Sequence, residues 1–209
     1  MTILKKHRTL IIISVSLIAV CCAAYGLWFL ISDWGYAREI SLAEQQKRQL
    51  FLDTAQAWLG YSEDDQSHRE MIDLYNGHEP LAQGYQVQYG DKWCATFVSA
   101  TAIQCSYTGI IPTECSCERQ IALFQQLSCW EEDDAYVPLP GDIIYYSSED
   151  NGLGDCTAWS DHVGIVVGTR LNWIKVLEGN NQNAVRFRYI PINAVTIRGY
   201  GLPDYASIS

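Results

Sequence analysis

A predominantly apolar run covers residues 9–31 and contains no charged side chain. A helix needs about 20 apolar residues to cross the hydrocarbon core of a bilayer, so the run predicts one membrane-spanning helix. Basic residues in segment 1–8 precede the run and acidic residues follow it. This positive-inside bias predicts a single-pass cell-membrane protein with a cytoplasmic N-terminus and an extracellular C-terminal domain. A cleaved signal peptide is the alternative, although its apolar core is shorter, roughly 7–15 residues.

Beyond the run, polar residues 32–46 are predicted to form a spacer, and one domain is predicted at residues 47–206. The domain begins with helical periodicity. In the first predicted helix, at about residues 47–60, Phe51 and Ala55 fall on one apolar face. Further helical segments are predicted at residues 70–75, 94–106 and 117–127.

From residue 139 the pattern changes to short segments rich in β-branched and aromatic residues, each bounded by Gly, Asn or Pro. A turn is expected at Pro140-Gly141. Strands are predicted at residues 142–146, 162–167, 173–178, 184–190 and 195–200. Helices followed by a run of short strands predict an α+β domain in which the N-terminal helices pack on an antiparallel sheet.

The charge is distributed unevenly. The net formal charge is −10, but residues 1–32 hold three of the fourteen Lys and Arg and none of the 24 Asp and Glu, so the remainder carries −13. Binding to a phosphate backbone depends on clustered Lys and Arg. The composition therefore argues against nucleic acid as a partner.

Cys94 is the first candidate for chemistry, because a polar, glycine-containing approach gives way there to Ala-rich sequence with helical spacing. In the first turn of a helix, unpaired N–H groups and the helix dipole favour a thiolate over a thiol. The alternative is structural, since a buried thiol packs as a small hydrophobe and an even set of cysteines can form disulfides. Six cysteines follow the apolar run: Cys94, Cys105, Cys115, Cys117, Cys129 and Cys156.

Two successive predicted strands indicate where a base could lie. With their turn at residues 168–172, His162 pairs opposite Glu178 and both side chains point to one face of the hairpin. Asn180 lies two residues beyond Glu178, so its side chain is predicted to point to the same face of the hairpin. The carboxylate would then fix the tautomer of His162, which takes the proton of Cys94.

Four motifs follow one another along the domain: Trp93-Cys94-Ala95-x-Phe97-Val98, Pro140-Gly141-Asp142, Asp161-His162-Val163-Gly164-Ile165-Val166 and Glu178-Gly179-Asn180. Together they resemble the signatures of the CHAP domain (cysteine, histidine-dependent amidohydrolase/peptidase), within the NlpC/P60-like, papain-type group. The resemblance implies a papain-like fold. It also implies that Cys94 is the nucleophile, His162 the general base, and Glu178 and Asn180 the orienting groups.

The same resemblance implies an enzyme that hydrolyses amide bonds of peptidoglycan through a thioester. The bond would lie either between muramic acid and L-alanine or within the stem or cross-bridge peptides. Two alternatives stay open. One is a catalytically silent, membrane-tethered wall-binding or assembly module with Cys94 in a disulfide, and the other is a thiol peptidase acting on protein.

Neither a cofactor nor a metal ion is predicted. Some members of the resembled family bind calcium through acidic residues ahead of the cysteine, but residues 86–91 offer only Asp91. Asp150, Asn151 and Asp155 form a second calcium candidate, but the loop lacks the full spacing of oxygen ligands, which favours an ordinary Asx turn. The expected partners are peptidoglycan and the cytoplasmic membrane.

Overall fold

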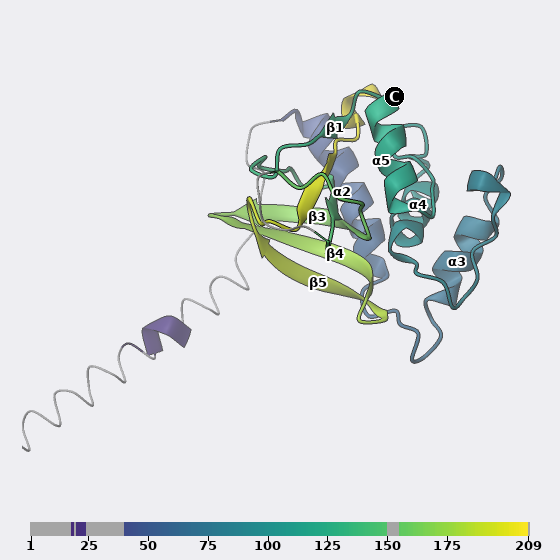
Figure 1. Cartoon of the computed structure of the whole chain (residues 1–209), viewed down its shortest axis with the longest axis horizontal. Helices are drawn as coiled ribbons and strands as arrows, with labels where there is room; N and C mark the ends of the chain where they lie inside the picture. The colour runs from purple at the N-terminus through teal and green to yellow at the C-terminus, as the bar shows by residue number, and fades with distance from the viewer. Residues whose placement is uncertain (1–17, 19, 24–39, 150–154, 209) are drawn as a thin grey trace, which may run out of the picture. The chain divides into compact units, whose positions relative to one another are not determined.

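The computed structural model describes residues 18, 20–23, 40–149 and 155–208, whose helices and strands are drawn in Figure 1. The chain divides into two compact units, Met1–Asp33 and Trp34–Ser209, and the second is described below. The predicted cytoplasmic segment, most of the predicted anchor and the first part of the spacer lie outside the described residues. Within the described ranges, no helix combines the length and apolar character needed to span a bilayer.

The helices of the second unit are α2 (Leu42–Ala57), α3 (Arg69–Asn76), α4 (Cys94–Gln104) and α5 (Cys117–Gln126), with short 3-10 turns at η1 (Ala82–Gly84) and η2 (Tyr205–Ser207). The predicted start of the first helix near residue 47 is wrong, because α2 begins at Leu42. Ser41 caps it by accepting the backbone N–H of Glu44 at 3.1 Å. The end of the predicted spacer is therefore helical.

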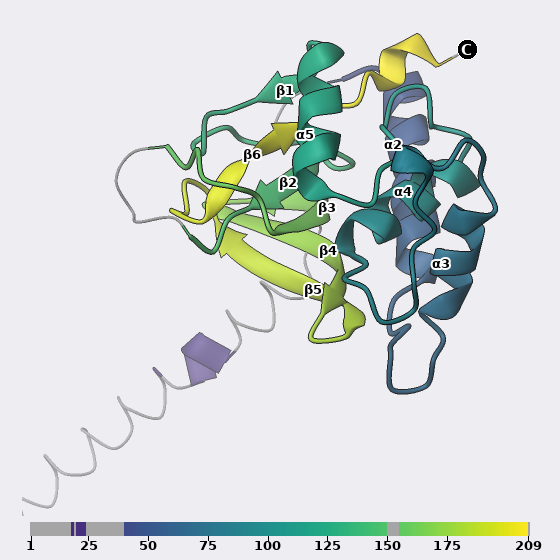
Figure 2. The ribbon, with the colours of Figure 1, turned by 45° about the vertical axis from the view of Figure 1, so that its right-hand side comes forward.

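The strands form one six-stranded antiparallel sheet in the order β1-β6-β2-β3-β4-β5. They are β1 (Trp130–Glu131), β2 (Ile143–Tyr146), β3 (His162–Arg170), β4 (Trp173–Asn181), β5 (Ala184–Pro191) and β6 (Ile197–Gly201). The predicted α+β class with an antiparallel sheet is confirmed, and the two-residue strand β1 was missed. Helices α2, α3 and α4 lie beside one another on the same side of the sheet (Figure 2).

Helix α4 is the buried centre of the domain. Every side chain from Cys94 to Ala102 is buried, and the helix packs against α2, α3, β3 and β4. Strand β4 comes closest at Gly179, where an added Cβ would lie 2.4 Å from the Cβ of Phe97. Because only a glycine fits there, the start of α4 is held against the strand that carries Glu178.

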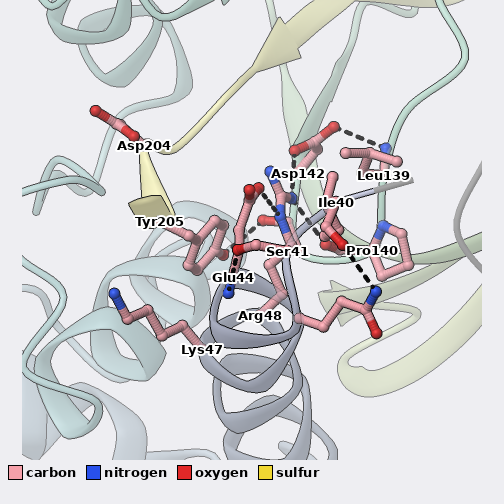
Figure 3. A network of polar contacts seen from close by, with 12 residues as sticks. Ile40, Ser41, Glu44, Lys47, Arg48, Leu139, Pro140, Asp142, Asp204 and Tyr205 are labelled. Carbon is pink, nitrogen blue, oxygen red and sulfur yellow. Dashed lines mark hydrogen bonds and ion pairs between the residues drawn. The ribbon is translucent and has the colours of Figure 1, made fainter. Parts of the chain in front are cut away.

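A buried arginine joins α2 to the turn that precedes β2 (Figure 3). The guanidinium of Arg48 donates to Oδ1 of Asp142 and to the carbonyl oxygen of Pro140, both at 2.9 Å. Its Nε donates to Oε1 of Glu44 at 2.8 Å, and its Cζ lies 4.5 Å from the ring centre of Tyr205. Since Asp142 is only 1% exposed, its charge depends on this partner.

Replacing Arg48 with methionine is expected to lower the free energy of unfolding by about 3–5 kcal/mol, because the carboxylate of Asp142 would stay buried without its charged partner. Chemical denaturation followed by circular dichroism measures the change. The control is Arg186→Met, since Arg186 is exposed and donates to the exposed side chain of Gln182, and surface substitutions of this kind usually change the free energy of unfolding by about 0.5 kcal/mol or less. Equal losses for the two variants would contradict this prediction.

Candidate active site

Cys94 is the first residue of α4, in the first turn where the sequence predicted it. Trp93 before it has a non-helical conformation, so the helix begins at the cysteine itself. The residue is a free thiol and is 5% exposed. The backbone N–H of Ala95 hydrogen-bonds its sulfur, so the N-terminus of the helix stabilises a negative charge there.

The hairpin of β3 and β4 brings His162 and Glu178 together, although in a register that differs from the predicted one. The structure pairs Val166 with Val176 rather than with Ile174. The predicted five-residue turn is wrong, because both strands extend until only two residues separate them. Next to the turn the register is displaced by three residues, since Arg170 pairs with Trp173, and the β-bulge between Val166 and Gly168 takes back one. The net shift of two residues preserves side-chain parity, so His162 and Glu178 still share a face.

The imidazole of His162 is fixed on two sides. Its Nε2 lies 3.0 Å from Oε2 of Glu178, and its ring stacks on that of Tyr146 with centroids 5.8 Å apart. Gly164 makes room for the first contact, since an added Cβ there would lie 2.8 Å from Cγ of Glu178. The side chain of a larger residue at this position would displace the carboxylate from the imidazole.

Glu178 is completely buried and accepts three side-chain hydrogen bonds. Besides His162, the donors are Nδ2 of Asn181 at 2.8 Å and Nε of Arg188 at 2.6 Å. The guanidinium of Arg188 places a positive charge directly against this buried carboxylate group. The sequence analysis missed both donors. The signal for Arg188 is the alternation of arginines on β5, where Arg186 is the direct partner of Glu178 and Arg188 lies diagonal to it.

Asn180 does not occupy the predicted orienting position. The pairing of β4 with β5 shifts between Glu178 and Asn181, and Asn180 has a φ of 56° at this irregularity. The extra residue reverses side-chain parity, so Asn181 takes the place beside the carboxylate. The amide of Asn180 instead donates to Oε1 of Glu63 at 2.9 Å, and the same oxygen accepts Nε1 of Trp93 at 3.0 Å. Asn180 therefore connects β4 to the start of α4.

Cys94 and His162 stabilise each other's charged forms. A hydrogen bond from the thiol of Cys117, followed in strength by contact with the imidazole, holds the pKa of Cys94 well below its ordinary value despite burial. Burial lowers the pKa of His162, but hydrogen bonds with Cys94 and Glu178 outweigh it and raise the pKa to about 9. Because Nε2 faces Glu178, Nδ1 is the nitrogen left for the sulfur. Both shifts favour a thiolate at Cys94 paired with an imidazolium at His162.

A groove of about 440 Å³ opens beside His162. Its lining includes the carboxylate of Asp161, the guanidinium of Arg188 and several hydroxyl and amide side chains. The lining residues are Tyr146, Ser147, Ser148, Asp161, His162, Asn180, Asn181, Gln182, Arg188 and Thr196. A ligand with charged and hydrogen-bonding groups suits such a groove better than an apolar one.

Among the residues that the structure describes, no group of three or more His, Cys, Asp or Glu side chains is arranged to hold a metal ion. Most of the predicted Asx turn, residues 150–154, lies outside the described ranges.

Comparison of the chain with protein-family models, with curated proteins and with solved structures found no match in any of the three. The resemblance based on the four motifs therefore stays a prediction. The functional argument rests on the geometry of the site.

If the hydrolysis predicted from the sequence takes place at Cys94, the raised pKa of His162 sets its alkaline limit. We expect kcat/KM for amide hydrolysis to be maintained through neutral pH and to fall as the pH rises through about 9, because the imidazolium that protonates the leaving amine is then lost. A pH–rate profile measured at low substrate concentration tests this. A fall near 6.5, the ordinary imidazole value, would contradict the proposed ion pair.

Proposed function

We propose that this chain is a cysteine-dependent hydrolase that cleaves amide bonds of peptidoglycan at the outer face of the cytoplasmic membrane. The observation that carries the proposal is the contact of an unbridged Cys94 with His162, whose other ring nitrogen is held by the buried Glu178. These contacts link a nucleophile to a base and the base to an orienting carboxylate, which is the arrangement that acyl transfer requires.

In the proposed reaction, the thiolate of Cys94 attacks the carbonyl carbon of the amide and forms a tetrahedral oxyanion. Backbone N–H groups at the start of α4 are the nearest preorganised donors for that charge. The imidazolium of His162 then protonates the departing amine, leaving a thioester. Neutral His162 next takes a proton from water, which attacks the thioester and releases the carboxylic acid and the thiolate.

The order of the parts supports a papain-like fold. A helix that opens with the nucleophile is followed by antiparallel strands that carry first the base and then its carboxylate. Helix α4 packs directly against both of those strands. This is the arrangement that the resemblance to the CHAP domain implies, and it does not depend on the register that the sequence analysis misjudged.

The groove favours a hydrated peptide as the substrate. Asp161 can pair with a free amino group, and Arg188, whose side chain is 43% exposed, can pair with a carboxylate. Stem peptides of peptidoglycan carry both kinds of group. The predicted anchor at residues 9–31 would keep the domain close to the membrane and restrict it to the nearby wall.

The state of Cys94 argues against the catalytically silent alternative. A wall-binding module has no use for a thiol of lowered pKa beside a half-buried histidine and a buried glutamate, because enclosing charged groups costs desolvation energy without improving packing. A peptidase acting on protein would use the same residues, so only the products can separate it from a peptidoglycan hydrolase.

Mass spectrometry of digests decides between these substrates. Purified full-length protein is incubated with purified sacculi, and the soluble muropeptides are compared with those from the Cys94→Ala variant. We expect cleavage of one type of amide bond, with a new amino terminus at L-alanine for an amidase or within the peptide for an endopeptidase. Unchanged sacculi together with cleavage of an unfolded protein substrate would contradict the proposal and favour the protein peptidase.

A further inference from the structure

A second buried thiol lies next to the nucleophile and, apart from its hydrogen bond to Cys94, takes no part in the proposed reaction. Cys117 is the first residue of α5, and its sulfur is 3.9 Å from the sulfur of Cys94. Both residues are nearly enclosed, with 7% of Cys117 and 5% of Cys94 exposed. Hydrolysis by Cys94, His162 and Glu178 needs no second sulfur, so this contact calls for a separate explanation.

The approach of these two sulfurs differs from the surroundings of other thiols in the domain. The sulfurs of Cys105 and Cys129 face the backbone carbonyl oxygens of Leu50 and Leu127. The sulfur of Cys117 instead faces another sulfur across the gap between two helix N-termini. A disulfide requires a sulfur–sulfur distance of about 2.05 Å. The two sulfur atoms, now 3.9 Å apart, must therefore approach each other by about 1.9 Å.

We propose that Cys94 and Cys117 form a reversible disulfide when the protein meets a hydroperoxide, and that this bond switches the hydrolase off. The inference rests on the proposed function, since the sulfur that is oxidised is the proposed nucleophile. Once bridged, Cys94 is no longer a thiolate and cannot attack the substrate carbonyl, and His162 loses the thiolate that it pairs with.

The two sulfurs have different parts in the oxidation. The thiolate of Cys94 attacks one oxygen of hydrogen peroxide, the O–O bond breaks, and a sulfenic acid forms while hydroxide leaves and is protonated to water. The sulfur of Cys117 then attacks the sulfenic sulfur, and the departing hydroxide takes the thiol proton as a second water. Two thiols and one peroxide thus give one disulfide and two waters. A dithiol reductant reverses the bond by thiol–disulfide exchange.

The electrostatics agree with this assignment of parts. The pKa of Cys94 is lowered by the hydrogen bond from Cys117 and by His162, which makes Cys94 the reactive thiolate. Donation of that hydrogen bond and burial raise the pKa of Cys117, which keeps it a thiol until Cys94 is oxidised. A small oxidant also suits the site, since both sulfurs are almost completely covered.

Peptide mapping of the full-length protein tests the inference. The reduced protein is treated with hydrogen peroxide, remaining thiols are alkylated, and the unreduced digest is analysed by mass spectrometry. We expect a linked pair of peptides containing Cys94 and Cys117, about 2 Da lighter than their sum, with at least a roughly tenfold loss of hydrolysis that dithiothreitol restores. The absence of that linked pair from oxidised wild-type protein would overturn the inference.

Two variants sharpen the result. In Cys117→Ala the sulfenic acid has no resolving thiol, so peroxide should produce sulfinic acid at Cys94, about 32 Da heavier, and a loss that dithiothreitol does not reverse. Cys105→Ala should behave as the wild type. Recovery of peroxide-treated Cys117→Ala equal to that of the wild type would overturn the switch.

The linked peptide is detected by mass and hydrolysis by product release, so the two proposals can fail separately. A reduced protein that never releases muropeptides contradicts the proposed function. A protein that hydrolyses peptidoglycan but yields no bridge between Cys94 and Cys117 contradicts only the switch. The peptide map of the wild-type protein requires no substitution, so the inference can be tested even if a variant proves unstable.

Discussion

Cys94→Ala is expected to reduce amide hydrolysis by at least about 10³-fold, because removal of the nucleophile from a catalytic unit leaves only the contribution of binding and oxyanion stabilisation. The substitution removes a sulfur from a side chain that is free of disulfide bonds, so the fold should survive it. Initial rates of product release from solubilised peptidoglycan measure the effect, and a circular dichroism melt confirms that the variant is folded.

The control for this experiment is Cys129→Ala. Cys129 is a thiol of the same domain whose sulfur faces the carbonyl oxygen of Leu127 and has no contact with His162 in the described structure. It should retain the wild-type rate. A folded Cys94→Ala variant that keeps more than about a tenth of the wild-type rate would show that catalysis does not pass through this sulfur.

Glu178→Gln is expected to lower kcat by about 10²–10⁴-fold while keeping the shape of the side chain. The neutral amide cannot stabilise the imidazolium of His162, and it leaves the guanidinium of Arg188 without its counter-charge. Because Glu178 contributes to the raised pKa of His162, the alkaline limb of the pH–rate profile should move below about 9. The rate and the profile are measured together, since a merely structural role would change the first without the second.

Glu114→Gln is the matched control for this change. Glu114 is also a buried glutamate, with an ion pair to Arg119 and a hydrogen bond from Gln83, but these contacts belong to the segment between α4 and α5. Both substitutions should cost stability. Only Glu178→Gln should shift the alkaline limb, and an unshifted limb in that variant would remove Glu178 from the proposed mechanism.

Local sequence patterns were sufficient to predict the class of fold and the placement of His162 and Glu178 together. Apolar residues at helical spacing predicted α4 and α5, and short β-branched segments predicted five of the strands, because these signals depend on neighbours within one element. The placement of His162 and Glu178 on one face also followed from the sequence. That inference tolerated an error of two residues in register, since side-chain direction in a strand repeats every two residues.

The same reasoning failed near the end of β4, where one residue is inserted into the strand. Asn180 was predicted beside Glu178 on parity, but the irregularity between Glu178 and Asn181 reverses the side-chain direction. Nothing in Glu178-Gly179-Asn180-Asn181 distinguishes regular pairing from a bulge. A positive φ costs little at asparagine, so the sequence permits the bulge without requiring it.

By itself, the sequence determined an α+β domain, a cysteine at the first turn of a helix, and a histidine and a glutamate on one face of a hairpin. Tertiary structure alone decided that Asn181 and Arg188 hold the glutamate, that Arg48 joins α2 to Asp142, and that Cys117 touches the nucleophile. Periodicity is a property of one element and can be read along the chain. Contacts between elements depend on how their surfaces pack, and residues far apart in the sequence give no local sign of meeting.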